Sequence, residues 1–250
     1  MVTTGGRWHD IQCPIRENCY SSFACTAQYA QRGLAPAGLE DYQKGDMIFY
    51  GQDAEQAVLN VRTGIAVVIN YQANGEAVII GLVGQGVMVG EMEAFFQIKY
   101  PYVIKMLTPV TVCKYYAVHL VQVVNENPLY LGQVIAAIEN NDHALGRQLW
   151  VMNAQRVQER LRRQLAILAN FQAFAREEVN PLPLTHDDLA LLINTDRSTV
   201  SRCLKRLEEE GFVKLGYQSV TVTGAYTLKD LDVNFRVYPA GGNRSILPGG

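Results

Sequence analysis

The stretch from residue 184 to 213, LTHDDLALLINTDRSTVSRCLKRLEEEGFV, constrains the fold more than any other part of the sequence. Thr185 is followed three residues later by Asp188, a pattern that resembles a capping box and predicts a short helix ending near Ile193. Ala190 is small, which allows a second helix to cross closely. Asn194 falls at the expected turn, where its side chain tolerates a left-handed backbone. The stretch therefore predicts two short helices joined by a tight turn.

The second of these helices is predicted from Asp196 to Glu210, with Gly211 as a C-cap just past its end. Its apolar positions recur at helical spacing and are Val200, Cys203, Leu204 and Leu207. The opposite face is polar and cationic and carries Arg197, Ser198, Ser201, Arg202 and Lys205. An ordinary helical hairpin with a solvated face shares this amphipathicity, but the turn asparagine and the Arg-Ser face favour a DNA-binding helix-turn-helix.

The segment FVKLGYQSVTVT follows the helix-turn-helix and predicts a two-stranded wing with Gly216 in its turn. Residues 153–217 hold 10 Lys and Arg against 9 Asp and Glu, a net charge of +1. Residues 1–152 hold 9 against 13, a net charge of −4. Contact with nucleic acid must therefore depend on where the positive charges lie and not on their total.

The sequence pattern is different from about Gly38 to His119. Here short runs of apolar residues, or of alternating apolar and polar residues, are broken by glycine. The sequence ANGE, at residues 73–76, is a strong hairpin signal because Asn-Gly supplies the positive φ of a tight reversal. The sequence RTG, at residues 62–64, is predicted to be a second turn. This region therefore predicts an all-β unit of about eight strands.

A long helix is predicted from Pro128 to about Met152, which is about 25 residues or roughly 37 Å. Asp142 interrupts its apolar seam once, and the seam otherwise consists of Leu131, Ile135, Ile138, Leu145, Leu149 and Met152. A parallel partner helix in a homodimer would bury such a seam, whereas packing onto the β unit would account for part of the helix surface. Asn153 is predicted to cap a further helix.

In this order, the β unit, the long helix and the winged helix-turn-helix resemble the Crp/Fnr family of bacterial transcription regulators. The phrases that carry the resemblance are KGDMIFYGQD, RTGIAVVI, NGEAVIIGLVGQGVMVGE and STVSRCLKRLEEEGFV. The resemblance spans residues 38–230 and implies an α+β fold with an N-terminal β roll (cupin-like, of the cyclic-nucleotide-binding type). The expected parts are a cysteine-bearing segment (1–37), a β-roll sensor domain (38–125), a dimerisation helix (126–152), a winged helix-turn-helix domain (153–236) and a disordered tail (237–250).

The resemblance implies a dimeric, effector- or redox-responsive regulator that binds a palindromic operator in double-stranded DNA and contacts RNA polymerase. Arg202 would read a guanine, because its fork matches O6 and N7 together. Ser201 and Arg197 would contact neighbouring base edges, and phosphate contacts would come from Lys205, Arg206 and Lys214. Many family members carry Glu where this chain has Ser198, so a different half-site is expected.

Cysteines mark a possible sensor. Cys13, Cys19 and Cys25 are evenly spaced, and Cys113 falls where the oxygen-sensing Fnr-like branch has its fourth cysteine. Four thiolates suit an iron–sulfur cluster. Six-residue steps turn each cysteine about 120° around an α-helix or separate them by about 20 Å on a strand, so convergence requires an irregular loop. A thiol–disulfide switch and simple buried thiols remain alternatives, and Cys203 is expected to be structural.

Cyclic AMP is not expected to bind. The cyclic-nucleotide branch follows its Gly-Glu with an Arg-Ser or Arg-Thr pair, but here the pair is Pro101 and Tyr102, which cannot neutralise a phosphate. Leu145 and Gly146 replace the hydroxyls that would face the purine. A small organic effector is the alternative, in a pocket near Glu91, Tyr102 and Lys105. Haem is a weaker option, because the four histidines share no ligand spacing.

Several other classes of protein are disfavoured. The chain has no apolar run of the roughly 18 residues that span a membrane, and its first residues lack a signal-peptide pattern, so a cytoplasmic protein is expected. An iron–sulfur or thiol oxidoreductase would need a Cys-x-x-Cys or Cys–His pair, and neither is visible, so no enzyme is expected. A ligand-binding module that uses the helical hairpin to contact a protein remains a further alternative.

Overall fold

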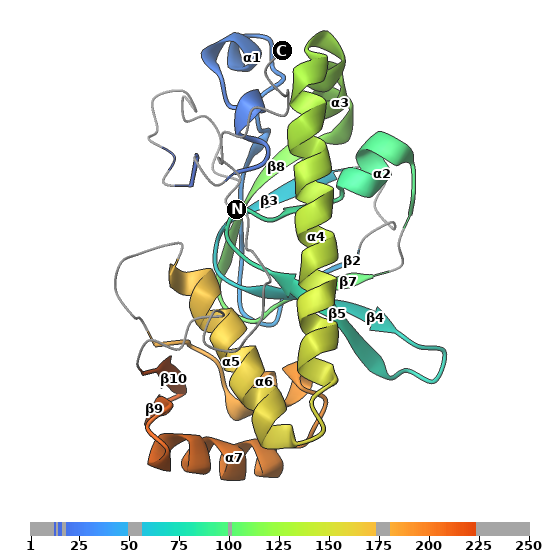
Figure 1. Ribbon diagram of the computed structural model, residues 1–250. Helices are drawn as coiled ribbons and strands as arrows, with labels where there is room; N and C mark the ends of the chain where they lie inside the picture. Colours follow the sequence, from blue (N-terminus) through green and yellow to red (C-terminus); the bar gives the residue numbers. More distant parts are fainter. Residues whose placement is uncertain are drawn as a thin grey trace, which may run out of the picture.

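The computed structural model describes residues 13, 15–16, 19–49, 57–99, 102–173 and 181–223. The tail predicted at 237–250 lies outside these residues. The fold is the expected α+β arrangement, with the long helix α4 running beside the β-strands (Figure 1). The helix-turn-helix lies at one end of α4, and α1 (Ala27–Gln31) and α3 (Ala117–Glu126) lie at the other.

The β roll consists of eight strands within the described residues, as the sequence predicts. The strands are β1 (Gly38–Tyr42), β2 (Met47–Phe49), β3 (Ala57–Thr63), β4 (Ala66–Tyr71), β5 (Ala77–Val83), β6 (Met88–Val89), β7 (Val103–Met106) and β8 (Val110–Tyr116). They form two four-stranded antiparallel sheets with the orders β1-β8-β3-β6 and β2-β7-β4-β5. One apolar cluster of the roll contains Leu59, Val61, Val83, Val89, Ile104, Met106, Val110 and Val112.

Two glycines hold the predicted turns of the roll. Gly64 in RTG has φ +88° and Gly75 in ANGE has φ +83°, and both values favour glycine. A Cβ added at Gly64 would lie 2.2 Å from the carbonyl oxygen of Pro109, whereas a Cβ at Gly75 would meet nothing within 4 Å. The two turns therefore share a backbone conformation but differ in the space around them.

Gly64→Ala should destabilise the protein more than Gly75→Ala. Both variants place a Cβ at positive φ, which costs about 1–2 kcal/mol. Gly64→Ala must also displace the Pro109 backbone, which adds about 1–3 kcal/mol of overpacking. Urea unfolding monitored by circular dichroism would measure both free energies of unfolding. Equal losses in the two variants would contradict the proposed steric role of the Gly64 turn.

Helices cover the ends and one side of the roll. The chain enters α2 (Glu91–Phe96) after β6, and α3 follows β8 directly, although the sequence analysis predicted neither helix. The long helix α4 (Leu131–Met152) ends where predicted and begins after a 3-10 turn at Pro128–Tyr130. Its 22 residues span about 33 Å.

The predicted cap at Asn153 is wrong. Asn153 has helical dihedral angles (φ −74°, ψ −9°) and forms the C-cap of α4. The next helix, α5, spans Val157–Ala173, and the carbonyl of Arg156 accepts hydrogen bonds from the backbone of Glu159 and Arg160 at its start. A helical asparagine cannot act as an N-cap, which requires an extended backbone.

Two faces of α4 differ in burial. The face toward the roll is buried through Val134, Ala137 and Val151, and a Cβ at Gly81 of β5 would lie 3.5 Å from the Cβ of Ala144. Four of the six apolar seam residues are exposed: Leu131, Ile135, Leu145 and Leu149 are 42%, 55%, 39% and 63% exposed. The other two, Ile138 and Met152, are partly buried against the apolar clusters. The helix therefore packs on the β unit through one face and leaves most of the predicted seam exposed.

The C-terminal unit contains α5, α6 (His186–Leu192), α7 (Arg197–Glu209), β9 (Val213–Gly216) and β10 (Ser219–Val222). Its core includes Leu161, Leu165, Leu189, Leu192, Val200, Leu204, Leu207 and Phe212. The predicted wing forms, but Gly216 pairs with Ser219 inside the ladder. The turn is Tyr217–Gln218, and Gln218 takes the positive φ of 49°.

Candidate DNA-binding surface and sensor sites

The helix-turn-helix forms through the local signals expected. Thr185 and Asp188 make a complete capping box at the start of α6, and Asn194 has φ +49° in the turn. Asp196 caps α7 by accepting a hydrogen bond from the backbone of Thr199 at 2.9 Å. Each helix start is thus stabilised by residues within a few positions of it, which fixes where α7 begins.

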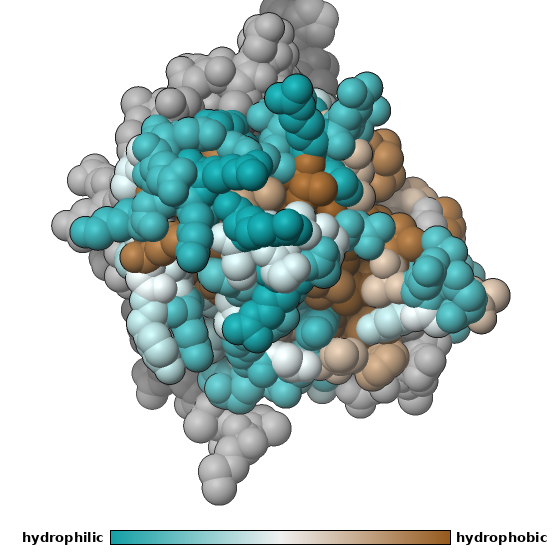
Figure 2. Space-filling view, turned by 90° about the horizontal axis from the view of Figure 1, so that it is seen from below, coloured by the Kyte–Doolittle hydropathy of each residue, from teal (hydrophilic) through white to brown (hydrophobic). Residues whose placement is uncertain are grey.

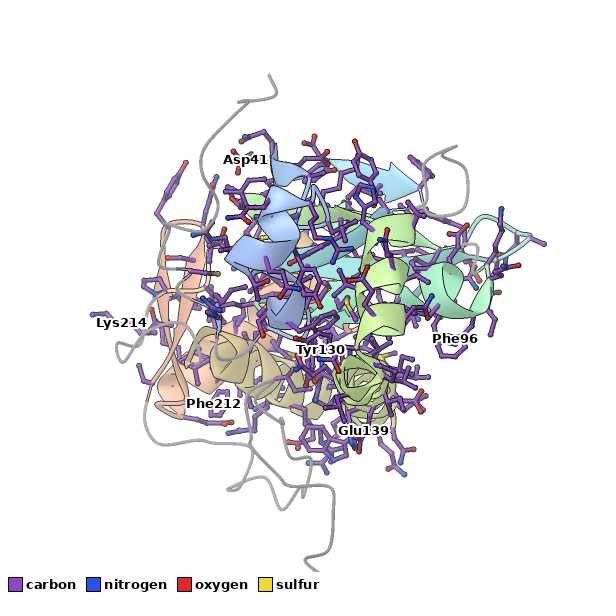
Figure 3. All side chains as sticks on the ribbon, turned by 90° about the horizontal axis from the view of Figure 1, so that it is seen from above. Asp41, Phe96, Tyr130, Glu139, Phe212 and Lys214 are labelled. Carbon is purple, nitrogen blue, oxygen red and sulfur yellow. The ribbon has the colours of Figure 1, made fainter. Side chains whose placement is uncertain are left out.

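The outer face of α7 carries the residues predicted to contact DNA. Arg197, Ser198, Arg202, Lys205 and Arg206 are exposed, and Ser201 is half-buried. The wing adds Lys214 on β9, which is exposed and projects away from the body of the molecule (Figure 3). The underside of the molecule, where α7 lies, is largely hydrophilic (Figure 2). All seven predicted side chains therefore belong to α7 and the adjacent strand of the wing.

Short hydrogen bonds organise the first turn of α7. Ser198 Oγ donates to Asp196 Oδ1 at 2.5 Å, and Thr199 Oγ1 donates to Asp196 Oδ2 at 2.7 Å. These bonds hold the pKa of Asp196 below its ordinary value, with Ser198 the largest cause. Arg202 Nη2 donates to Thr199 Oγ1 at 3.0 Å. The cap therefore also orients the arginine that is expected to read a base.

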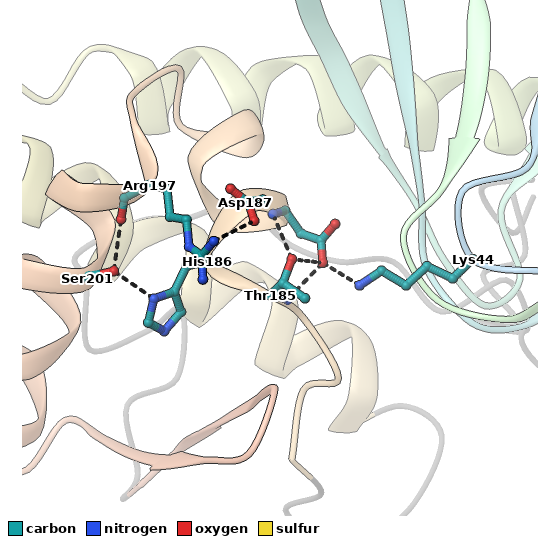
Figure 4. A network of polar contacts seen from close by, with 7 residues as sticks. Lys44, Thr185, His186, Asp187, Arg197 and Ser201 are labelled. Atoms are coloured by element: carbon teal, nitrogen blue, oxygen red, sulfur yellow. Dashed lines mark hydrogen bonds and ion pairs between the residues drawn. The ribbon is translucent and has the colours of Figure 1, made fainter.

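Ser201 contacts two partners, and the sequence analysis predicted neither contact. Its hydroxyl donates to the carbonyl of Arg197 at 2.9 Å and lies 2.8 Å from Nδ1 of His186 (Figure 4). His186 is the first residue of α6, so this contact ties the two helices of the motif together. No local pattern signals it, because the residues are 15 positions apart.

A contact between the β roll and the helix-turn-helix involves Asp188. Its Oδ2 accepts hydrogen bonds from the backbone of Thr185 at 2.7 Å and from Lys44 Nζ at 2.5 Å (Figure 4). Lys44 lies in the loop between β1 and β2, within the phrase KGDMIFYGQD. The carboxylate that caps α6 thus also bonds the sensor domain.

In its described residues, the N-terminal cysteine segment contains turns closed by hydrogen bonds between residues three positions apart. The backbone amides of residues 16, 19, 22 and 25 each donate to the carbonyl three residues earlier. Ser22–Ala24 forms a 3-10 helix within this segment. The sequence analysis required an irregular loop for the cysteines to converge, and the described residues around Cys19 and Cys25 form short turns.

The fourth cysteine lies in electrostatic reach of these three. The pKa of Cys113 is raised to about 12, mainly by burial. The nearby thiols of Cys19, Cys25 and Cys13 are the smaller causes that raise it. Burial is likewise the largest cause that raises the pKa of Cys19 to about 11. Tyr115, two residues beyond Cys113 on β8, bonds Cys25 Sγ at 3.0 Å. The four predicted cysteines therefore gather in one region of the protein.

Asn60 on β3 is the register partner of Cys113 on β8. It is fully buried, and neither Nδ2 nor Oδ1 has a hydrogen-bond partner among the described residues. Within that part of the chain, no three Cys, His, Asp or Glu side chains are arranged as a preformed metal site. The region thus offers four thiols and an unused amide, without a fixed coordination geometry.

A cavity of about 380 Å³ lies between the β roll and α4. Of the three residues predicted for an effector pocket, Glu91 and Tyr102 line this cavity and Lys105 does not. Tyr102 directly precedes β7 and Lys105 lies three positions further along, so the alternation of side chains along a strand separates them. A role of Lys105 in effector binding stays a prediction. Asn141 of α4, which sequence reasoning missed, donates to Glu91 Oε1 at 2.8 Å.

None of the helices in the described ranges has the length and apolar character needed to cross a membrane.

Comparison with known proteins assigns both halves of the chain. The family model of the Crp-like helix-turn-helix domain matches residues 159–231, and that of the cyclic nucleotide-binding domain matches residues 39–127. The cyclic AMP receptor protein of Thermus thermophilus is 26% identical over 191 residues, which cover 76% of this chain and 86% of that protein.

Solved structures show the same fold. FixK2 from Bradyrhizobium japonicum aligns with a TM-score of 0.63 and 18% identity, covering 78% of this chain and 96% of that one. The c-di-GMP-responsive regulator CLP from Xanthomonas campestris aligns with a TM-score of 0.61 and 20% identity, covering 80% and 100%. With an effector-binding β roll, a long helix and a helix-turn-helix DNA-binding domain, the chain belongs to the Crp/Fnr family of transcription regulators.

Proposed function

We propose that two copies of the chain pair through α4 and present their two α7 helices to a two-fold symmetric operator. The observation that carries this proposal is the apolar seam of α4, whose positions recur in steps of three and four and of which Leu131, Ile135, Leu145 and Leu149 are exposed in the single chain. Such spacing suits a parallel helix pair. A symmetric dimer would place its recognition helices in successive major grooves, about 34 Å apart.

Within each half-site, Arg202 would read a guanine through O6 and N7, and Ser201 and Arg197 would contact neighbouring base edges. Lys205, Arg206 and Lys214 would bind phosphates. Ser198 offers no carboxylate to accept from cytosine N4, and its hydroxyl is already bonded to Asp196. The half-site should therefore differ from those of family members that carry Glu at this position.

Selection from random double-stranded DNA would test the operator proposal. We expect enriched sequences with two inverted half-sites whose centres lie about 10 base pairs apart. Binding should weaken steeply as salt rises, since phosphate contacts release counterions. Enrichment without symmetry would contradict the proposed dimeric reading. As a regulator the protein would also act in the cytoplasm with RNA polymerase, and no enzymatic activity is proposed for it.

A second proposal concerns the cysteines. We infer that Cys13, Cys19, Cys25 and Cys113 together are the ligands of an iron–sulfur cluster, whose chemistry when bound is one-electron transfer and reaction with oxidants. The gathering of the four thiols supports it, and the unused amide of Asn60 could donate a hydrogen bond to sulfur beside Cys113. A thiol–disulfide switch is the alternative use of the same cysteines; burial raises the pKa of Cys19 and Cys113 and so disfavours the thiolate that either disulfide exchange or cluster ligation requires.

Anaerobic purification should yield a brown protein with near-stoichiometric iron and sulfide. Cys113→Ser should abolish the visible absorbance, because it removes the ligand on β8. Cys203→Ala is the matched control: this buried cysteine lies on the core-facing side of α7, so its loss should leave the spectrum intact. A visible spectrum, with iron and acid-labile sulfide assays, gives the readout. Colourless protein after anaerobic reconstitution would contradict the cluster.

A further inference from the structure

The cavity between the β roll and α4 does not fit the anionic ligand that its family model suggests. A cyclic nucleotide carries a phosphate, which needs a cation or several hydrogen-bond donors to replace its water. Among the described residues, no Lys, Arg or His lines the cavity. Its ionisable lining groups there are Glu91, Asp142 and the phenol of Tyr102, so an added anion would face two acidic groups.

Glu91 provides a buried carboxyl group in the wall of this cavity. Only 4% of its surface is exposed. Oε1 accepts from Asn141, but Oε2 is buried and has no hydrogen-bond partner among the described residues. Burial raises the pKa of this carboxyl group. A buried carboxylate oxygen without a donor is costly, so a ligand that brings an N–H group into hydrogen-bond reach would be bound strongly.

Most of the remaining lining is apolar. Val68, Leu82 and Val83 line the cavity from the two strands β4 and β5, and Met92 lines it from α2, whereas the other polar groups are those of Asn70, Tyr102, Asn141 and Asp142. A mainly apolar wall with a few placed polar groups is typical of a site for a small organic ligand. Within the described residues, no three Cys, His, Asp or Glu side chains are arranged as a metal site.

We propose that this cavity binds a small organic amine, whose ammonium group donates to Oε2 of Glu91 while its apolar body fills the space between β5 and α4. Asp142 at the α4 side adds a second negative charge that favours a cation. This ligand site is separate from the cysteine region, and its existence does not depend on the cluster or on the proposed operator.

The same site borders the α4 seam. Ile138, Asp142 and Leu145 line the cavity and also occupy seam positions. A bound amine would therefore contact side chains that the proposed partner helix also contacts. Occupancy can then change how two α4 helices pair, which is a physical route from ligand to recognition helix.

Isothermal titration of the full-length protein with matched probes would test the ligand class. The amines are hexylamine, phenethylamine and tryptamine, and each is compared with its carboxylate counterpart: heptanoate, 3-phenylpropionate and indole-3-propionate. Cyclic AMP is the seventh probe. We expect at least one amine to bind, and to bind about tenfold or more tightly than its carboxylate partner. The amine can form a charge-assisted hydrogen bond with the buried Glu91, and the carboxylate cannot.

Glu91→Gln should weaken binding of that amine by about tenfold or more, because it removes the charge while keeping the size of the side chain. Glu93→Gln is the control, since this residue of the same helix pairs with Lys99 and does not line the cavity. Circular dichroism would establish that both variants are folded. The proposal fails if no amine binds, if carboxylates or cyclic AMP bind more tightly, or if folded Glu91→Gln binds amines as well as the parent.

Discussion

Arg202→Ala should abolish sequence-specific DNA binding and leave the fold unchanged. The side chain is exposed on α7 and is oriented by Thr199, so its removal leaves no cavity. A bidentate arginine–guanine contact is worth about 1–3 kcal/mol. Because the proposed dimer would lose the contact in both half-sites, we expect a loss on the order of 30-fold to 10⁴-fold in affinity for the selected operator. Fluorescence anisotropy with that operator would measure it.

Two further variants separate base reading from charge. Arg202→Lys keeps the positive charge but loses the planar fork, so it should lose preference for the operator over random DNA and keep much of the non-specific affinity. Lys214→Ala should weaken binding to all sequences about equally and reduce the salt dependence, as expected for a phosphate contact on the wing. Unchanged operator preference in Arg202→Ala would refute the assigned role of this residue.

Local signals were enough to predict the helix-turn-helix. Thr185 and Asp188 satisfy each other's backbone groups within three residues, and Asn194 and Gly211 each take the left-handed conformation that few residues tolerate. Such features depend on neighbours in sequence and hardly on the rest of the fold. The same holds for the strands of the β roll, whose glycine turns at positions 64 and 75 break the chain where expected.

The parts of the sites that sequence reasoning missed depend on contacts between distant segments. Lys44 meets Asp188 across 144 positions, and Asn60 lies beside Cys113 only because β3 pairs with β8. Asn141 reaches Glu91 because α4 packs on the roll. Lys105 does not line the cavity for another reason: strand parity separates it from Tyr102, and a pocket assigned by proximity in sequence ignores that parity.

The α4 seam leads to the second large effect. Leu149→Asp should convert the proposed dimer to a monomer, because it places a charge at the most exposed leucine of the seam, which is 63% exposed in the single chain. Each copy would lose about 1.5–3 kcal/mol of apolar burial, so the dimer would lose about 3–6 kcal/mol, a factor of roughly 10² to 10⁴ in its dissociation constant. Sedimentation velocity over a range of concentrations would measure the change.

Val118→Asp is the matched control for this substitution. Val118 is 69% exposed on α3 and is not a seam residue, so the introduction of the same charge there should leave association intact. Glu139 of α4 lies on the side of the helix away from the β sheets (Figure 3). A monomer produced equally by both variants would show that added charge, and not loss of the seam, disrupts the dimer.

Asp142→Leu tests the seam in the reverse direction. It fills the single polar position of the seam and removes two carboxylates that a parallel pair would bring face to face, so it should tighten the dimer. Operator affinity should follow the same order, because a monomer presents one recognition helix where the dimer presents two. If Leu149→Asp stays dimeric and Asp142→Leu has no effect, the two copies must pair through another surface.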